Sequence, residues 1–341
     1  MWAMIVKEFR QLRRDRRTVA MMVALPILLL VIFGYAASFN VTSIPTTVSG
    51  PEARLVAGLL RAPFDVTSVD VSGTRAQAVT ALTDGDTAAA VVTGPQGATV
   101  LLDGTQLFTA QAALRAVDEA GAHLPPGFTL QAQVLFNPGL TTSAVMVPGL
   151  AAMILLFIGT VITSLGVVRE RQAGTLEQLA VMPFRPRDVF LGKIAPYFAV
   201  GAVDMILVVA VGMALFDVPF RGSILVFGLG ALLFLFVALG IGVLISSVSQ
   251  NQGQAIQLAL MTLLPQIMLS GLIFPLTSMA AGVRWIGYLL PLTYFVEIAR
   301  GVMLRATPIT SLWQPFLYLA VIGAVVVTLS TLRFRRLLGA S

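Results

Sequence analysis

The sequence predicts an α-helical integral membrane protein with six transmembrane helices and an inserted α/β domain outside the cytoplasm. The chain is 57% apolar and only 11% charged, with a mean hydropathy of +0.89, which lies well outside the range of ordinary globular proteins. Several apolar runs are long enough to cross a membrane, and a long, more polar segment separates the first two. Composition, run length and spacing together define the fold class.

The six predicted spans are the apolar stretches at about 18–38, 146–168, 194–216, 223–247, 255–274 and 314–332. A helix rises 1.5 Å per residue, so about 20 residues cross a hydrocarbon core of about 30 Å. The first run, of about 20 residues, exceeds the 7–15 typical of a signal peptide, so we expect it to be retained as a span. An even number of spans places both termini on one side.

Basic residues predict which side that is. The tail before the first span, the loop 169–193 and the C-terminal tail together carry fourteen Lys and Arg against five acids, a net of +9. The segment 39–145 carries four Arg and eight acids, a net of −4. Since short basic loops stay in the cytoplasm, we expect both termini and the loop 169–193 there, and the segment 39–145 outside. The overall charge of +6 is therefore a topology signal and does not indicate a nucleic-acid partner.

The segment 39–145 is expected to fold as an extracytoplasmic α/β domain. A helix at about 51–61 precedes strands at 64–71, 88–93, 98–103 and 130–136, with helices starting near 76 and 107 between them. The order is β-α-β-β-α-β, the split βαβ arrangement. The absence of Cys excludes disulfides and thiol redox chemistry. Two roles remain open: a lid or docking surface for substrate or an envelope adaptor protein, and a brace for the spans.

The loop 169–193 is predicted to contain a short amphipathic helix at 176–182. Thr175 and Gln178 form a capping-box pattern, Gly174 breaks the preceding helix and Pro183 ends the new one. Leu176 and Leu179 share one face of this helix while Glu177 points elsewhere. Such a helix can bury a small apolar patch against a cytoplasmic partner.

Several motifs resemble the permease subunits of ABC-2 type transporters, in particular the multidrug-export branch with a large extracytoplasmic domain between its first two spans. They are VVRERQAGTLEQLAVMPFRPRDVFLGKIAPYF, LRRDRRTVAMMVALPILLLVIFGYA, LFNPG and SGLIFPL…PLTYFVEIARG. The resemblance implies two copies of a separate ATP-binding subunit, which holds ATP and Mg, and a second permease copy or paralogue. It also implies that the loop after the second span is a coupling helix, and that residues 1–17 form an amphipathic interface helix against membrane lipid. By this resemblance, the expected ATPase-coupling positions are Glu170, Gly174, Thr175, Leu176, Glu177 and Leu179.

The same resemblance places an outer re-entrant segment at 275–312. Glu297 and Arg300 lie three residues apart on one predicted helical face there, and we expect them to form an ion pair. An unpaired charge at membrane depth costs about 2.5–3.5 kcal/mol on insertion scales. Asp204, Gln266 and Ser270 are candidates for a transport path, although pairing of Asp204 with a neighbouring helix or snorkelling explains that residue equally well.

Catalytic motifs are absent from the sequence. There is no G-x-x-x-x-G-K-[ST], so the chain is not expected to bind ATP itself, and no motif predicts a catalytic or metal site. We therefore expect a multi-pass permease subunit of an ATP-driven exporter in a bacterial cytoplasmic (inner) membrane, moving amphiphilic drugs or lipid-like molecules outward. The alternative is a non-transporting membrane sensor or scaffold coupled to a cytoplasmic partner.

Overall fold

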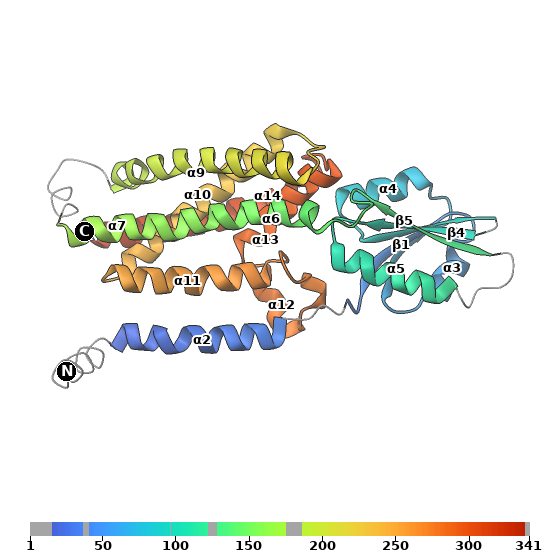
Figure 1. The fold of residues 1–341 in the computed structure, drawn as a ribbon, viewed down its shortest axis with the longest axis horizontal. Helices are drawn as coiled ribbons and strands as arrows, with labels where there is room; N and C mark the ends of the chain where they lie inside the picture. The colour runs from blue at the N-terminus through green and yellow to red at the C-terminus, as the bar shows by residue number, and fades with distance from the viewer. Residues whose placement is uncertain (1–15, 37–40, 96, 122–127, 175–185, 338–341) are drawn as a thin grey trace.

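The computed structural model describes residues 16–36, 41–95, 97–121, 128–174 and 186–337. The molecule is elongated, with a bundle of helices at one end and an α/β domain at the other (Figure 1). The predicted interface helix 1–17 falls almost wholly outside the described residues, as does the predicted coupling helix 176–182.

Among the described residues, four helices are long and apolar enough to cross a membrane. They are Thr142–Gln172, Ile194–Phe216, Ile224–Val248 and Trp313–Arg333. Helices of spanning length therefore stand at four of the six predicted spans, those at 146–168, 194–216, 223–247 and 314–332. The other two predicted spans form helices α2 (Arg16–Ala36) and α11 (Gln252–Leu269), and their crossing of a membrane stays a prediction.

The first of the four spans is built from three consecutive helical pieces. These are α6 (Thr142–Phe157), the π-helical turn η1 (Ile158–Ile162) and α7 (Thr163–Gln172). At the π turn the backbone of this span lies in close contact with the backbone of α10 (Ile224–Val248). A Cβ on Gly242 of α10 would lie 2.3 Å from the carbonyl oxygen of Gly159. Glycine is therefore required there, because any side chain would force the two helices apart.

The remaining helices surround this crossing. α14 (Trp313–Leu337) packs along α10, and α9 (Pro186–Phe216) packs against α6 and α10. α11 contacts α7 and η1 on one side and α2 on the other, so α2 lies at the edge of the bundle (Figure 1). Ile32 of α2 is buried against Leu269, Phe274 and Met279.

The α/β domain contains a five-stranded sheet in the order β2-β1-β3-β4-β5. Its strands are β1 (Ile44–Ser49), β2 (Phe64–Asp70), β3 (Ala89–Gly94), β4 (Gly97–Asp103) and β5 (Thr129–Leu135). β3 and β4 form an antiparallel hairpin, and the other neighbouring strands are parallel. Helices α3 (Ala53–Leu59) and α5 (Leu107–Gly121) cover one face and α4 (Arg75–Asp84) the other.

The predicted order β-α-β-β-α-β is incomplete, because it omits β1. This strand is central, pairing in parallel with both β2 and β3. Pro45 at its second position argues against a central strand, since proline cannot donate to a ladder. The fold accommodates Pro45 by using only its carbonyl, which accepts hydrogen bonds from the backbone of Ala88 (3.1 Å) and the hydroxyl of Thr87 (2.8 Å).

The segment 275–312 holds two short helices joined at a sharp bend. α12 (Ala281–Gly287) meets the helix formed by α13 (Pro291–Arg300) and the π turn η3 (Gly301–Arg305) at 75°. Together they are apolar and long enough to count as one broken span or a re-entrant loop. η3 ends at Ala306, whose φ of +58° turns the chain toward the α/β domain.

Candidate functional site

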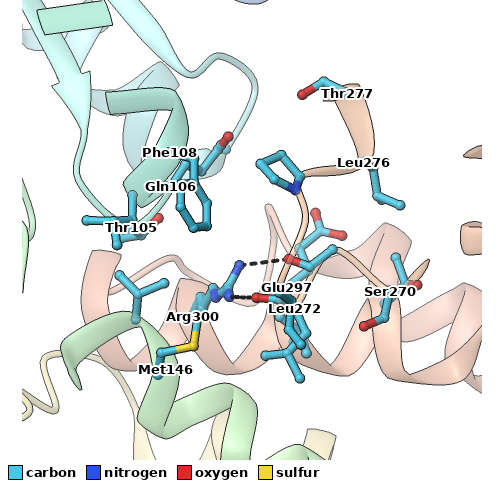
Figure 2. A pocket seen from close by; sticks show the side chains of 18 of the residues that line it. Thr105, Gln106, Phe108, Met146, Ser270, Leu272, Leu276, Thr277, Glu297 and Arg300 are labelled. Atoms are coloured by element: carbon cyan, nitrogen blue, oxygen red, sulfur yellow. Dashed lines mark hydrogen bonds between the residues drawn. The ribbon is translucent and has the colours of Figure 1, made fainter. Parts of the chain in front are cut away.

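A cavity of about 280 Å³ lies where the α/β domain meets the helical bundle (Figure 2). The α/β domain contributes Gly85 and residues 105–108, which lead from β4 into α5, and α6 contributes Val145 and Met146. The end of α11 and the outer helices supply the remaining wall, with Ser270, Leu272, Glu297, Arg300 and Arg305 among its residues. The cavity is therefore bounded by both domains, and any change in their relative position would change its shape.

A buried ion pair joins the two domains at the edge of this cavity. Nη1 of Arg305, at the end of η3, lies 3.3 Å from Oδ2 of Asp103, at the end of β4. Their side chains are 7% and 0% exposed. The other carboxylate oxygen of Asp103 accepts a hydrogen bond of 2.9 Å from the backbone N–H of Thr105. Removing one member of a buried pair leaves an uncompensated charge, at a cost of about 3–5 kcal/mol.

Two further contacts hold the same joint. The hydroxyl of Thr307 donates to the carbonyl of Thr83, at the end of α4, at 2.6 Å. Gly85 has a φ of +86°, and a Cβ there would lie 3.0 Å from Nη1 of Arg305. The positive φ and the close guanidinium both favour glycine at this position. η3 is thus seated directly on the α/β domain.

The connection from β5 to α6 is fixed by Asn137 of the LFNPG motif, which is 5% exposed. Its Oδ1 accepts hydrogen bonds from the backbone N–H (3.1 Å) and the hydroxyl (3.0 Å) of Thr141. Its Nδ2 donates to the carbonyls of Thr141 (3.1 Å) and Gly104 (3.2 Å). The side chain therefore ties the start of the first long span to the turn that follows β4.

The predicted ion pair between Glu297 and Arg300 is not formed, although both residues are described and both line the cavity. Arg300 donates instead to the carbonyls of Leu272 at 3.0 Å and Gly271 at 3.3 Å (Figure 2). The chain breaks after α11 and exposes these carbonyls, which have no helical partner. The guanidinium is therefore used as a cap, and the exposed Glu297 faces the cavity.

The three candidate path residues divide between two places. Ser270 lines the cavity, and its buried hydroxyl has no hydrogen-bond partner among the described residues. Gln266 lies one turn earlier on α11, is 1% exposed, and has an unpartnered Oε1 within the same described part of the chain. Asp204 lies on α9, away from the cavity lining, with a buried Oδ2 for which the described residues supply no partner. The structure thus brings Ser270 and Gln266 together and leaves Asp204 apart.

The predicted coupling positions are described only in part. Thr175, Leu176, Glu177 and Leu179 lie outside the described residues, whereas Glu170 lies on α7. Gly174 follows α7 with a φ of +75° and open space around its Cβ position. This glycine turns the chain out of the helix, as the sequence predicts.

The same end of α7 is bound to the turn between α10 and α11. The guanidinium of Arg171 donates to the carbonyl of Ser249, and Nε2 of Gln252 donates to Oε1 of Gln172 at 3.0 Å. α7 and the start of α11 are therefore connected by side chains. Within the described ranges, no three His, Asp or Glu side chains are grouped to hold a metal ion.

Four residues of the site are not indicated by the sequence alone: Asp103, Arg305, Asn137 and Thr307. Asp103 and Arg305 lie 202 positions apart, and no local pattern links them. A turn-forming Asn-Pro-Gly stands at 137–139, which indicates a turn at Asn137 but not the contacts of its side chain.

These features define a multi-pass helical membrane protein with an α/β domain docked on one end of its bundle. The family model described as "ABC-2 family transporter protein" matches residues 16–332. The chain belongs to this family and is the ABC-2 permease of a transporter.

Curated relatives extend over nearly the whole chain. The probable multidrug ABC transporter permease YbhS of Escherichia coli K12 is 29% identical over 98% of this chain and 96% of its own length. The probable multidrug ABC transporter permease YbhR of the same strain is 28% identical over 98% of both chains. The inner membrane transport permease YhhJ of E. coli K12 is 33% identical over 63% of this chain and 58% of its own.

Proposed function

We propose that this permease exports amphiphilic drugs or lipid-like molecules from the cytoplasm, driven by a separate ATP-binding subunit that binds to the loop 169–193. Membership of the ABC-2 family is the observation that carries the proposal. The names of two full-length relatives, both probable multidrug permeases, support the substrate class. Two copies of the ATP-binding subunit would hold ATP and Mg and would act on two permeases, either identical or paralogous.

A continuous helix supports transmission from that loop to the cavity. The span Thr142–Gln172 is 31 residues long, so it reaches about 45 Å at 1.5 Å per residue. Its first turns include the cavity residue Met146 and follow Asn137, and its other end leads into the loop 169–193. A displacement of its loop end would therefore reach the cavity wall through one uninterrupted run of helical pieces, α7, η1 and α6.

A second helix runs parallel to this route. α11 begins at Gln252, whose side chain donates a hydrogen bond to Gln172, and it ends at Leu269, next to the cavity residue Ser270. Because α7 and α11 are connected at the loop end, a push on the loop would move both together. The cavity would open or close as these two helices shift against the α/β domain, which η3 and Asn137 hold at the other end.

The proposed orientation places both termini and the loop 169–193 in the cytoplasm, and the α/β domain outside a bacterial cytoplasmic (inner) membrane. The charge difference between the two sides supports it, with a net of +9 against −4. The printed name of the relative YhhJ, an inner membrane permease, supports the location. In this orientation the cavity beside the α/β domain lies at the outer side, so substrate that leaves the protein through it is exported. The α/β domain would meet an envelope adaptor where one exists.

The direct test is purification from native membranes in mild detergent, followed by mass spectrometry of bound proteins and an ATPase assay. The proposal expects a P-loop ATPase in stoichiometric amount, lost when Glu177 and Leu179 are both replaced by Lys. The double replacement of Leu55 and Leu59 by Lys, both exposed on α3 of the α/β domain, is the matched control and should keep the ATPase. A sensor or scaffold would instead show a ligand-dependent partner and no net movement of ligand.

A further inference from the structure

A second and larger cavity lies on the side of the helical bundle, between α9 and α10. This groove has a volume of about 580 Å³ and includes no charged side chain in its lining. Small residues form much of the wall: Gly201, Ala202, Ala210, Gly222, Gly228 and Ala231. Leu155 of α6 contributes from behind. At Gly228 a Cβ would meet no atom within 4 Å, so this part of the space is left unfilled, whereas Gly201 and Gly222 let the backbone pack closely against Leu235 and Val302.

The length of the groove along the helices is close to the thickness of one membrane leaflet. Its α9 wall runs from Gly201 to Met213 and its α10 wall from Ile224 to Leu235, which are lengths of about 18 Å and 17 Å at 1.5 Å per residue. Half of a hydrocarbon core is about 15 Å. Both walls belong to helices that are long and apolar enough to cross a membrane. Large apolar side chains at the edges of the groove are exposed, including Ile206 (68%) and Ile224 (76%).

One end of the groove opens at the loop between α9 and α10, where Phe220 and Gly222 belong to the lining. Arg221 stands between them and is exposed. Its backbone N–H donates to Met303 at 2.9 Å, and its Nη1 makes a long hydrogen bond of 3.5 Å to the carbonyl of Leu304. The loop therefore lies beside η3, on the side of the bundle that carries the α/β domain, with a guanidinium at headgroup level.

The position of the groove favours a flexible acyl chain as its occupant. Both walls are helices long and apolar enough to span a membrane, and an acyl chain enters from the bilayer that surrounds α9 and α10. The guanidinium beside the opening matches a phosphate, which it binds with its planar fork of donors.

We propose that this groove binds one acyl chain of a glycerophospholipid from the leaflet nearest the α/β domain, with the lipid phosphate on Arg221. The bound lipid would be a structural ligand that fills the space between α9 and α10 and connects the loop 217–223 to the bilayer. The proposal is independent of the transported substrate and of the direction of transport.

The test uses the full chain in nanodiscs that contain a phospholipid with a photoactivatable diazirine on its acyl chain. After irradiation, mass spectrometry maps the labelled residues. We expect labelling of α9 and α10 in the groove to exceed labelling of Val321 and Val325, which are exposed on α14. Equal labelling at both places would mean ordinary surrounding lipid only and would overturn the proposal.

A pair of glycine variants separates filling of the groove from general damage. Gly228→Leu places a side chain in the groove, and a Cβ at this position meets nothing within 4 Å, so the helix packing is kept. Gly34→Leu, in α2, is the matched control, because its Cβ position is equally open. Groove labelling should fall to the α14 level in the first variant and stay at the wild-type level in the second.

A pair of loop variants tests the phosphate contact. In competition with a diacylglycerol that lacks phosphate, the wild type should prefer the phospholipid by about fivefold, which corresponds to about 1 kcal/mol for one basic residue at the surface. Arg221→Gln should remove this preference. Asp217→Asn should keep it, and asparagine tolerates the positive φ of +50° at that position. An unchanged preference in Arg221→Gln, or crosslinks between two permease chains across the groove, would refute the assignment.

Discussion

The buried pair of Asp103 and Arg305 predicts how strongly the α/β domain is held on the bundle. Asp103→Asn keeps one acceptor oxygen for the Thr105 N–H and replaces the carboxylate oxygen that faces Arg305 with an NH2 group, so that the guanidinium of Arg305 stays buried without its charged partner. This should weaken the joint by about 3–5 kcal/mol, whereas the double replacement Asp103→Leu with Arg305→Met should recover much of the loss, because two apolar side chains leave no buried charge.

Hydrogen exchange measured by mass spectrometry on the purified protein reports this joint directly. Each 1.4 kcal/mol is a factor of ten, so backbone amides at 83–86, 103–106 and 301–307 should exchange at least about a hundredfold faster in Asp103→Asn. Amides of the α6–α10 crossing should be unchanged. Wild-type exchange at the joint in Asp103→Asn, or a double variant worse than the single, would refute the reasoning.

Three further predictions concern the crossing, the connection and the cavity. Gly242→Ala should lower the midpoint of thermal unfolding, since its Cβ would lie 2.3 Å from the carbonyl oxygen of Gly159 and overpacking costs about 1–3 kcal/mol; Gly228→Ala, in open space, should not. Asn137→Ala should speed proteolysis between β5 and α6, because leaving buried backbone groups unsatisfied costs about 1–3 kcal/mol; wild-type resistance would contradict the role. Glu297→Gln should leave folding unchanged by circular dichroism, since no ion pair is lost, and a large drop in stability would reveal a partner for this carboxylate.

The hydropathy of the sequence predicts the long apolar helices of the bundle. The spans in α9, α10 and α14 follow from apolar runs long enough to cross a bilayer, and such runs need no knowledge of their neighbours. α2 and α11 also form where apolar runs predict helices. β1 was missed because local propensity gives a poor account of a central strand that contains Pro45. β1 forms because it pairs with β2 and β3 in the folded domain, and such tertiary contacts override local strand propensity.

The site was less predictable, for the same physical reason. The spacing of Glu297 and Arg300 on one helix predicts an ion pair, yet the guanidinium of Arg300 donates to the carbonyls of Gly271 and Leu272 after α11 instead. Asp103 reads in sequence as an ordinary acid at the end of a strand. Only the approach of η3 from 202 positions away makes it half of a buried pair. Local spacing identifies which groups can interact, while the fold decides which ones do.

The most direct test of the central claim is ATP-dependent transport by the permease and its ATP-binding subunit, reconstituted together in proteoliposomes with a fluorescent amphiphilic cation. The account predicts net movement of the amphiphile toward the side that carries the α/β domain, dependent on ATP hydrolysis and abolished by replacing Glu177 and Leu179 with Lys. ATP hydrolysis that responds to the amphiphile without moving it, in vesicles shown to be sealed, would contradict the account and identify the chain as a sensor.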